Sequence, residues 1–359
     1  MSDGSGQRYL VTGANGFIGR ALCRRVQAEG HCVRALLRQP CAGPWDEVVH
    51  CDLAAGPLPP GLMNGVEGVF HLAGIAHVQD IAGVPDALYQ RVNVDATTAL
   101  LEAAAASGVR AFVYFSSIKA VAEPGEHCVD ESWDAWPEDA YGRSKREAEQ
   151  RVLDAGRATG LHVCNLRPSL VYGPGVKGNL ARMIDAIDRG RFPPLPEFHN
   201  RRSLVGLDDV IDAAWRAMHA PAAAGRSLIL AEPEPWSTHQ MAAAIRDALG
   251  KRAPRWPIPR TALLIGATLG DLVGAATGRR MPLNSAVLSR LRGWACFRSD
   301  AARRTLDWQP QQRFGTTLPA IIAARQSTAG ASGASGRKGL PAAGRKERLT
   351  AKRPKNRQE

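Results

Sequence analysis

This chain of 359 residues lacks the cysteine and histidine spacings that are typical of metal sites and disulfide networks. Its seven cysteines occur singly, their number is odd, and no Cys-x-x-Cys pair is found among them. The nine histidines form no His-Glu-x-x-His spacing. The sequence therefore predicts neither a metal site, zinc included, nor a disulfide framework.

Long apolar runs are missing as well. Residues 1–8 are polar and contain no apolar core of a signal peptide. The most apolar window, residues 261–278, includes Asp271 and several glycines and is below spanning length, so we expect a packed helix there. Together with the scattered cysteines, these features predict a cytoplasmic protein with no transmembrane segment.

Acidic residues are too few to balance the basic ones, and the formal net charge is +12. Residues 327–359 carry nine Lys and Arg against two Asp and Glu, which leaves a net charge of +5 for the rest of the chain. This segment has almost no large apolar side chains, so we expect a disordered basic tail. Contact with RNA, DNA or an anionic surface is one interpretation, and a dispensable solvated extension is the favoured one.

The chain does contain an alternation of buried strands and amphipathic helices up to about residue 170. Helical periodicity is found at 17–29, 88–107 and 141–158. This order predicts an α/β fold, with a Rossmann-type doubly wound parallel sheet at 1–170. Apolar runs place its strands at 8–12, 31–37, 48–51, 68–73, 111–116 and 161–167.

After Pro168 the pattern loosens, and the alternation of strands and helices is lost. Residues 171–326 are expected to form a smaller, mostly helical substrate-binding region, with a segment near 203–224 returning to the Rossmann domain. Such a region covers the carboxyl ends of the strands, where dinucleotide folds bind their ligands. Its helices are predicted at 180–189, 208–219, 239–249 and 301–306.

A glycine-rich turn, Thr12-Gly-Ala-Asn-Gly-Phe-Ile-Gly19, joins the first strand to the first helix. Gly13 permits a tight turn, Gly16 lets the backbone approach a pyrophosphate, and Gly19 lets the helix pack close to the strand. The helix N-terminus adds N–H groups and the positive end of its dipole. Three glycines alone are weak evidence, but the strand–turn–helix context predicts a dinucleotide site.

Two further motifs carry acid–base chemistry. Tyr141 and Lys145 share one face of a predicted helix, and the nearby cation is expected to lower the pKa of the phenol. Ser116 and Ser117 end a predicted strand, where a hydroxyl can polarise a substrate oxygen. A surface Tyr–Lys pair and a serine turn are the simpler alternatives, and the occurrence of both motifs favours catalysis.

These motifs, in this order, resemble the extended short-chain dehydrogenase/reductase family, and the resemblance covers roughly residues 8–310. Within it the chain looks most like the NAD-dependent epimerase/dehydratase branch, in the UDP-glucose 4-epimerase-like group of nucleotide-sugar 4-epimerases and 4-keto-reductases. Supporting segments are Cys51-Asp-Leu53, His71-Leu-Ala-Gly74, Leu166-Arg-Pro168, Arg201-Arg-Ser-Leu-Val205 and Leu306-Asp-Trp-Gln-Pro310.

The resemblance implies roles for the matching residues. Tyr141 would be the acid–base, Lys145 would bind the nicotinamide ribose, and Ser117 would contact the reacting oxygen of the sugar. Asn93 would tie a helix to the site. A nucleotide-sugar partner is implied, and a homodimer is compatible with the resemblance. The cofactor would lie against Gly13, Asn15, Gly16, Phe17, Ile18, Gly19, Asp52, Leu53, Ala73 and Gly74, and the substrate against Asn179, Leu180 and Arg202.

Two segments depart from the patterns of better-known relatives. The second strand ends Leu36-Leu37-Arg38, with no acidic residue to hold a ribose 2′-hydroxyl. Arg38 could pair with the 2′-phosphate of NADP, which slightly favours NADP or dual use over NAD alone, while a surface arginine is the alternative. After Ser117 the chain reads Ile-Lys-Ala-Val-Ala where many sugar epimerases end in Val-Tyr-Gly, which favours variants that act on polysaccharide precursors.

The sequence thus predicts NAD(P)-dependent hydride transfer at C4 of a nucleotide sugar, by an epimerase or by a 4-keto-reductase. One alternative is a 3β-hydroxysteroid-type or other hydrophobic-alcohol dehydrogenase, which shares a similar Ser-Ser-Ile segment. Another is a dinucleotide sensor whose tail engages nucleic acid. The sensor is ranked last because it has no need of Ser117, Tyr141 and Lys145 together.

Overall fold

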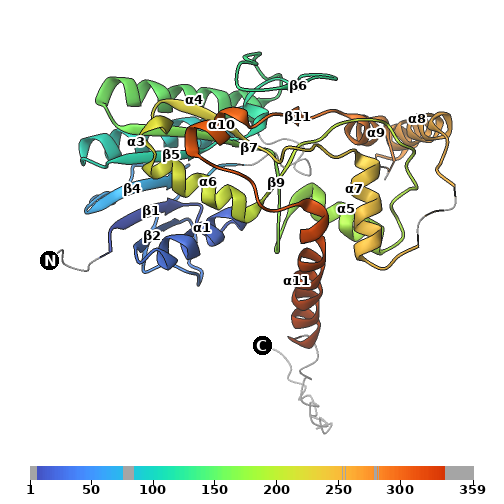
Figure 1. Cartoon of the computed structure of the whole chain (residues 1–359), viewed down its shortest axis with the longest axis horizontal. Helices are drawn as coiled ribbons and strands as arrows, with labels where there is room; N and C mark the ends of the chain where they lie inside the picture. The colour runs from blue at the N-terminus through green and yellow to red at the C-terminus, as the bar shows by residue number, and fades with distance from the viewer. Residues whose placement is uncertain are drawn as a thin grey trace, which may run out of the picture.

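The central sheet has seven strands in the order β10–β7–β5–β4–β1–β2–β3, and every neighbouring pair is parallel (Figure 1). The computed structural model describes residues 6–75, 85–252, 254, 256–278, 281 and 283–335. The strand order reverses between β1 and β4, which confirms the predicted Rossmann-type α/β fold. The strands are β1 (Arg8–Thr12), β2 (Cys32–Leu37), β3 (Glu47–His50), β4 (Val66–His71), β5 (Ala111–Phe115), β7 (His162–Pro168) and β10 (Arg226–Leu230).

Side chains alternate along each strand and enter two hydrophobic layers, one on each face of the sheet. In β1, Tyr9 and Val11 pack with α1, α6 and α10, whereas Leu10 packs with α3 and α4 on the other face. The core of the sheet therefore includes elements from beyond residue 170, because α6, β10 and α10 return to it. These helices are α1 (Phe17–Ala28), α3 (Ala96–Ala106), α4 (Ala140–Thr159), α6 (Leu207–His219) and α10 (Asp300–Leu306).

Several elements differ from the sequence expectation. The helix expected at 88–107 is divided into α2 (Asp86–Tyr89), a π-helical turn (Gln90–Asp95) and α3. Two small parallel sheets were not predicted, because each of their strands has only two or three residues and its partner lies far away in the sequence. They pair β6 (Cys128–Val129) with β11 (Cys296–Phe297), and β8 (Leu170–Tyr172) with β9 (Leu204–Gly206).

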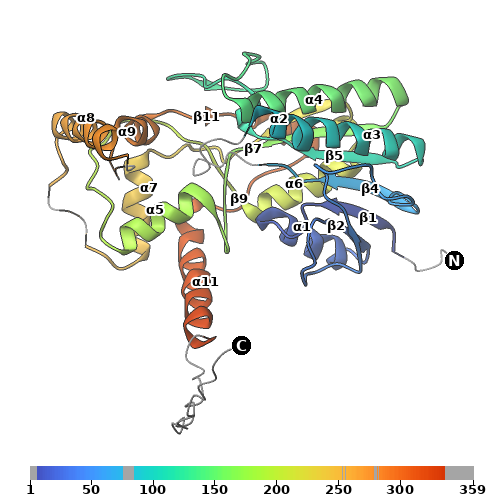
Figure 2. The same ribbon diagram turned by 180° about the vertical axis from the view of Figure 1, so that it is seen from behind.

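The second region lies to one side of the sheet and is mostly helical (Figure 2). Its last helix, α11, continues to Ser335, so the start of the segment predicted to be disordered is helical. The remaining residues of the predicted tail, 336–359, lie outside the described residues. The helices here are α5 (Gly178–Asp188), α7 (Thr238–Ala248), α8 (Arg260–Thr277), α9 (Ser285–Arg292) and α11 (Phe314–Ser335), and short 3₁₀ turns occur at Ile118–Ala120 and Pro221–Ala223.

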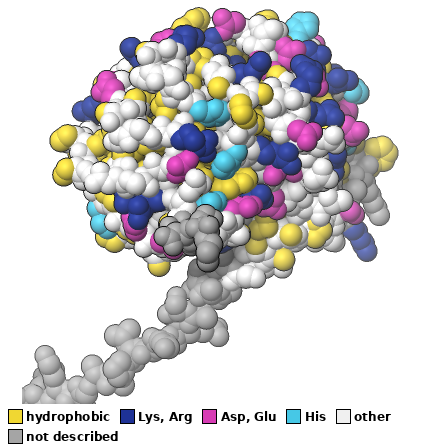
Figure 3. Space-filling view, turned by 60° about the vertical axis from the view of Figure 1, so that its left-hand side comes forward, with side chains coloured by type: hydrophobic (Ala, Val, Ile, Leu, Met, Phe, Trp, Pro, Cys, Tyr) yellow, Lys and Arg dark blue, Asp and Glu magenta, His cyan; other side chains and the backbone are white. Residues whose placement is uncertain are grey.

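The surface around the sheet carries both signs of charge. Figure 3 shows Lys and Arg interspersed with Asp and Glu over this face, with hydrophobic side chains scattered among them. Isolated apolar side chains of this kind are normal on a folded protein. Among the described helices, none combines the length and the apolar character that crossing a bilayer requires.

Candidate active site

A cavity of about 300 Å³ opens where β1, β4, β5 and β7 end, beside the N-terminus of α1. This is the edge at which a doubly wound sheet binds its ligands. The structure brings predicted residues from three separate segments to this cavity: Gly13, Gly16, Phe17, Ile18, Gly19, Gly74, Tyr141 and Lys145. Its wall also contains Ser116, from the predicted Ser116-Ser117 motif, and residues that were not predicted to bind a ligand: Leu72, Ile75, Phe115 and Pro168.

The glycine turn leaves no room for side chains at two of its positions. Gly13 has a φ of +66°, and a Cβ there would lie 2.8 Å from the amide nitrogen of Ala73. A Cβ on Gly19 would collide with the carbonyl oxygen of Gly13. The turn is closed by a hydrogen bond from Gly16 N to Gly13 O (2.9 Å). This bare backbone beside a helix N-terminus fits the pyrophosphate of a dinucleotide.

A buried histidine holds the glycine turn against the loop after β4. Thr97 donates its hydroxyl hydrogen to Asn93 O (2.7 Å), so its oxygen accepts from His71 Nε2 (2.8 Å). Nδ1 of His71 then accepts from the Thr12 hydroxyl (2.7 Å), whose oxygen accepts from Ala73 N (3.0 Å). Burial lowers the pKa of His71 to about 3, so the ring is neutral. No sequence motif pointed to this network.

The hydroxyl of Ser117 lies close enough to the phenol of Tyr141 to influence its pKa. Tyr141 is in the first turn of α4, whose N-cap Asp139 accepts from Gly142 N (2.9 Å). Ser117 follows β5 and caps a short 3₁₀ turn by accepting from Lys119 N (3.1 Å). The strand end and the helix start therefore bring a hydroxyl and a phenol together at the cavity edge.

The expected effect of Lys145 on the phenol is not found. Burial raises the pKa of Tyr141 to about 12, and the hydrogen bond from Ser117 lowers it by less. Lys145 is itself buried, and desolvation lowers its pKa to about 8. Its Nζ donates to Phe115 O (2.9 Å) and lies 4.7 Å from the centre of the Tyr114 ring. Since the ammonium is directed at β5, the predicted lowering of the phenol pKa is wrong for the chain on its own.

Asn93 joins the loop after β4 to α4, as the resemblance implied. Its Oδ1 accepts from Ile75 N (2.8 Å), and its Nδ2 donates to Ser144 Oγ (2.9 Å). A Cβ on Gly74 would lie 2.9 Å from Asn93 Oδ1 and 3.4 Å from Lys145 Nζ. A side chain at position 74 would therefore crowd the Asn93 amide and the Lys145 ammonium group.

The other cofactor residues lie around this centre. Arg38 is exposed at the end of β2. Asp52 is exposed after β3, and its Oδ1 accepts from Ala54 N (3.0 Å), while Leu53 is half-buried against the core. Asn15 is exposed within the glycine turn. None of these four side chains lines the cavity beside Tyr141.

The predicted substrate residues are placed less directly. Leu180 is buried in the core of the second region, and Asn179 is exposed beside Arg182. Arg202 donates from Nη1 to the carbonyls of Arg290 (2.9 Å) and Gly293 (3.0 Å). Desolvation lowers the pKa of its guanidinium. Arg202 is therefore a partly buried tie to α9 rather than a solvated charge.

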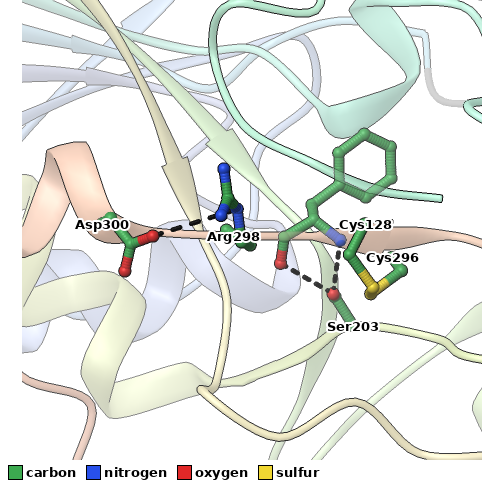
Figure 4. The surroundings of a disulfide bond; sticks show 6 residues. Cys128, Ser203, Cys296, Arg298 and Asp300 are labelled. Carbon is green, nitrogen blue, oxygen red and sulfur yellow. Dashed lines mark hydrogen bonds and ion pairs between the residues drawn. A yellow bond between two sulfur atoms is a disulfide. The ribbon is translucent and has the colours of Figure 1, made fainter.

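One prediction from the cysteines is wrong. Cys128 and Cys296 form a disulfide between β6 and β11, across 168 residues of sequence (Figure 4). Ser203 lies beside it and exchanges hydrogen bonds with the backbone of Phe297, accepting from N (2.8 Å) and donating to O (3.0 Å). The pairing of two short, distant strands creates this contact, so counting and spacing cysteines could not reveal it. The scattered cysteines therefore no longer argue for a reducing compartment.

The residues present fit a dinucleotide. The crowded glycine turn is a cradle of backbone, and the buried Ser116 hydroxyl on the cavity wall has no hydrogen-bond partner among the described residues. The turn would hold the pyrophosphate, and Tyr141 and Lys145 would face the nicotinamide half. The arrangement can move a proton between a substrate hydroxyl and the Tyr141 oxygen.

Comparisons with known proteins identify the family of this chain. Residues 9–230 match the model of the NAD dependent epimerase/dehydratase family. A UDP-glucose 4-epimerase of Vibrio cholerae is 30% identical over 328 residues, which are 88% of this chain and 95% of that protein. A 3 beta-hydroxysteroid dehydrogenase/Delta 5-->4-isomerase of Mycobacterium tuberculosis is 29% identical over 335 residues, which are 88% of this chain and 90% of that protein.

The solved structure of MoeE5 in complex with UDP-glucose and NAD has the same fold, with a TM-score of 0.72 at 22% identity over 90% of this chain and 99% of that one. The family match covers the whole sheet from β1 to β10, including the glycine turn, Ser117, Tyr141 and Lys145. The chain therefore belongs to the NAD-dependent epimerase/dehydratase family of extended short-chain dehydrogenases/reductases, and it is an NAD-dependent enzyme.

Proposed function

We propose that this enzyme oxidises and reduces C4 of a nucleotide sugar, as a UDP-sugar 4-epimerase or a 4-keto-reductase of polysaccharide precursor synthesis. The position of Tyr141 and the buried Lys145 in the wall of a cavity bounded by the glycine turn, with Ser117 next to the phenol, carries this proposal, because it puts acid–base groups at that cavity. The similarity to a UDP-glucose 4-epimerase over nearly the whole chain supports the substrate class.

Each side chain has a separable task in this reaction. Tyr141 accepts the proton of the C4 hydroxyl or returns it, and Ser117 donates a hydrogen bond that stabilises negative charge at that oxygen. Lys145 anchors the first turn of α4 to β5 through Phe115 O and adds positive charge to the cavity. The bound dinucleotide supplies the nicotinamide carbon that takes up or returns the hydride. Lys145 is buried, whereas Ser117 and Tyr141 are half-buried, so both hydroxyl groups can be reached by a ligand.

An epimerase and a reductase differ in whether the dinucleotide stays bound to the purified enzyme and in how the sugar is converted. We would denature the purified protein, identify released dinucleotides by mass spectrometry, and assay UDP-glucose, UDP-galactose and their N-acetylhexosamine counterparts for interconversion at C4. Tightly retained NAD with interconversion favours an epimerase. An empty site with consumption of NADPH on a UDP-4-keto-sugar favours a reductase. If no UDP-sugar is converted in either assay, the proposal is wrong.

Arg38 carries the choice between NAD and NADP in this proposal. It is exposed at the end of β2, where the sequence has no acidic residue. A guanidinium there matches a ribose 2′-phosphate. Replacing it in Arg38→Gln is expected to weaken NADPH binding by about tenfold, the effect of one lost charge-assisted contact, and to leave NADH binding unchanged. If Arg38→Gln weakened NADPH and NADH binding equally, Arg38 would not contact the 2′-phosphate.

A hydrophobic-alcohol dehydrogenase is the second candidate. The observation that favours it is the 29% identity to the steroid dehydrogenase/isomerase over 88% of this chain. The Arg202 side chain is already engaged with two backbone carbonyls, which also weakens the argument for a diphosphate partner. Oxidation of a 3β-hydroxysteroid with NAD, in a preparation that leaves every UDP-sugar unchanged, would favour this function over the first.

The proposal also includes the cellular compartment and the oligomeric state of the enzyme. Dinucleotides and nucleotide sugars are cytoplasmic metabolites, and we place the enzyme in the cytoplasm on that ground. A homodimer is the proposed assembly, and light scattering of the purified chain would measure it.

A further inference from the structure

Helix α8 presents an unusually apolar surface. Among the described residues, eight large hydrophobic side chains are exposed, and five of them lie on this one helix. A sixth, Trp256, is 82% exposed and precedes the helix by four residues. Scattered apolar side chains need no explanation, but a contiguous group marks an interaction site. The five on α8 are Leu264, Ile265, Leu269, Leu272 and Val273.

The exposed face of α8 is continuous and carries no charge. Leu263, Ala267 and Gly270 face the core of the second region. Successive helical residues turn by about 100°, so Ile265, Leu269 and Leu272 lie together on the opposite side, where they are 63%, 55% and 63% exposed. The single acidic residue of the helix, Asp271, lies to one side and accepts from Ser285 N of α9 (3.2 Å). Water therefore meets an uncharged apolar stripe.

The sequence segment that contains this stripe is rich in basic residues. Residues 251–293 contain eight Lys and Arg and one acidic residue, a net charge of +7. Leaving aside residues 327–359, the rest of the chain then carries a net charge of −2. Arg260 begins α8, and Arg290 and Arg292 lie in the last turn of the neighbouring α9. The positive charge outside residues 327–359 is thus concentrated in the sequence segment that contains the apolar helix.

We propose that α8 lies flat on an anionic lipid bilayer, with Ile265, Leu269 and Leu272 in the boundary of the headgroups and the surrounding arginines against lipid phosphates. An apolar helical face bordered by arginine is the pattern of interfacial helices. A second copy of the chain is disfavoured as the occupant, because pairing two such faces would bring two strongly positive segments together. The proposal is independent of which sugar the enzyme accepts.

The position of α8 in the molecule permits this contact. Figures 1 and 2 show it at the end of the molecule farthest from the N-terminal strands, beyond α7 and beside α9. The sheet and its cavity therefore stay on the far side of the helix from the lipid. Docking would hold the enzyme at a bilayer and leave the glycine turn open to a dissolved cofactor.

Flotation of the full-length protein with vesicles tests the proposal. One vesicle preparation is pure phosphatidylcholine, and the other is an equimolar mixture with phosphatidylglycerol. The test variant is Ile265→Asn/Leu269→Asn/Leu272→Asn, which changes exposed side chains only. The matched control, Val48→Asn/Trp136→Gln, removes exposed apolar groups elsewhere. Thermal unfolding and dinucleotide binding are compared for the wild type, the test variant and the control, each as the full chain.

We expect the wild type to float with the anionic vesicles and much less with phosphatidylcholine alone. The test variant should partition at least about tenfold less onto anionic vesicles, since three interfacial side chains are lost, while the control stays at the wild-type level. Unchanged flotation of the test variant would assign the binding to another basic segment and overturn the proposal. The proposal would also be overturned if the wild type did not float with anionic vesicles. It would likewise be overturned if the substitutions changed the protein from dimer to monomer and left vesicle binding unchanged.

Discussion

Lys145 Nζ donates a hydrogen bond of 2.9 Å to the carbonyl oxygen of Phe115, so the first turns of α4 are tied to the end of β5. This tie sets Tyr141, one helical turn before Lys145, beside Ser117, two residues after Phe115. Because Ser117 directly follows β5 and Tyr141 begins α4, the packing of this strand and helix sets the distance between the two groups. The acid–base pair is therefore organised before any ligand binds.

Removal of the Tyr141 hydroxyl is predicted to abolish most turnover. In Tyr141→Phe the ring stays in place and the proton acceptor is lost, so kcat with the active nucleotide sugar should fall by about 10²–10⁴-fold. Dinucleotide affinity and KM should change little. Tyr89→Phe is the matched control, because the centre of that buried ring lies 6.2 Å from the centre of the Tyr141 ring. Steady-state rates that stay near wild type in Tyr141→Phe would contradict the mechanism.

The neutral His71 makes the protein sensitive to acid. Its pKa of about 3 in the folded state is below the value near 6.5 of an unfolded chain, so the unfolded state binds a proton that the folded state does not. Stability is therefore lost as pH falls below about 6.5. The maximum loss, reached near pH 3, is roughly 4 kcal/mol from this one group.

Urea unfolding across pH 4–7 would measure this effect in the wild type and in His71→Gln. The variant should be less stable at pH 7, because Thr12 and Thr97 lose their shared partner. Its stability should also fall less steeply with acid, so the two curves approach each other at low pH. His50→Gln on the exposed end of β3 should retain the wild-type slope. Parallel curves for wild type and His71→Gln would show that the ring is not held neutral.

Alanine variants at two glycines with similar backbone angles allow the effect of conformational strain to be distinguished from the effect of crowding at the cofactor site. Gly13 has a φ of +66° and Gly108 a φ of +69°, but only Gly13 has atoms near the place of a Cβ. Both alanine variants should lose stability through strain, by about 1 kcal/mol. Gly13→Ala should in addition displace the loop at Ala73 and weaken dinucleotide binding by more than about tenfold. If Gly13→Ala and Gly108→Ala bound the dinucleotide with equal affinity, measured by calorimetry, the proposed role of Gly13 in holding the pyrophosphate would be wrong.

Local patterns were enough to predict most of the sheet and the centre of the site. Apolar runs and the glycine turn are contiguous in sequence, so they indicated β1, α1 and the convergence of Ser117 with Tyr141. The direction of the Tyr141 pKa was missed because burial, which dominates it, depends on the folded surroundings. The partners of Arg202 were missed for a related reason, since they are carbonyls at residues 290 and 293, on a helix end that packs against it only in the fold.

The Cys128–Cys296 disulfide is the feature that sequence reasoning missed most completely, and its consequences are measurable. It joins the segment after Ser117 to β11 and closes a loop of 168 residues. Constraint of the unfolded chain by such a loop stabilises a protein by about 2–4 kcal/mol. Cys128→Ser should lower the free energy of unfolding by this amount under oxidising conditions, and reduction of the wild type should have a similar effect. Cys51→Ser, at a cysteine that is free, should not.

Alkylation followed by mass spectrometry decides whether the bond is present in the protein as it is made. With the bond formed, iodoacetamide should leave Cys128 and Cys296 unmodified until a dithiol reductant is added, while accessible free cysteines react. Rapid labelling of both residues without reductant would show a pair of neighbouring thiols, as a reducing cytoplasm would maintain. In that case Cys128→Ser and the reduced wild type should unfold with equal free energies, because neither chain carries the cross-link.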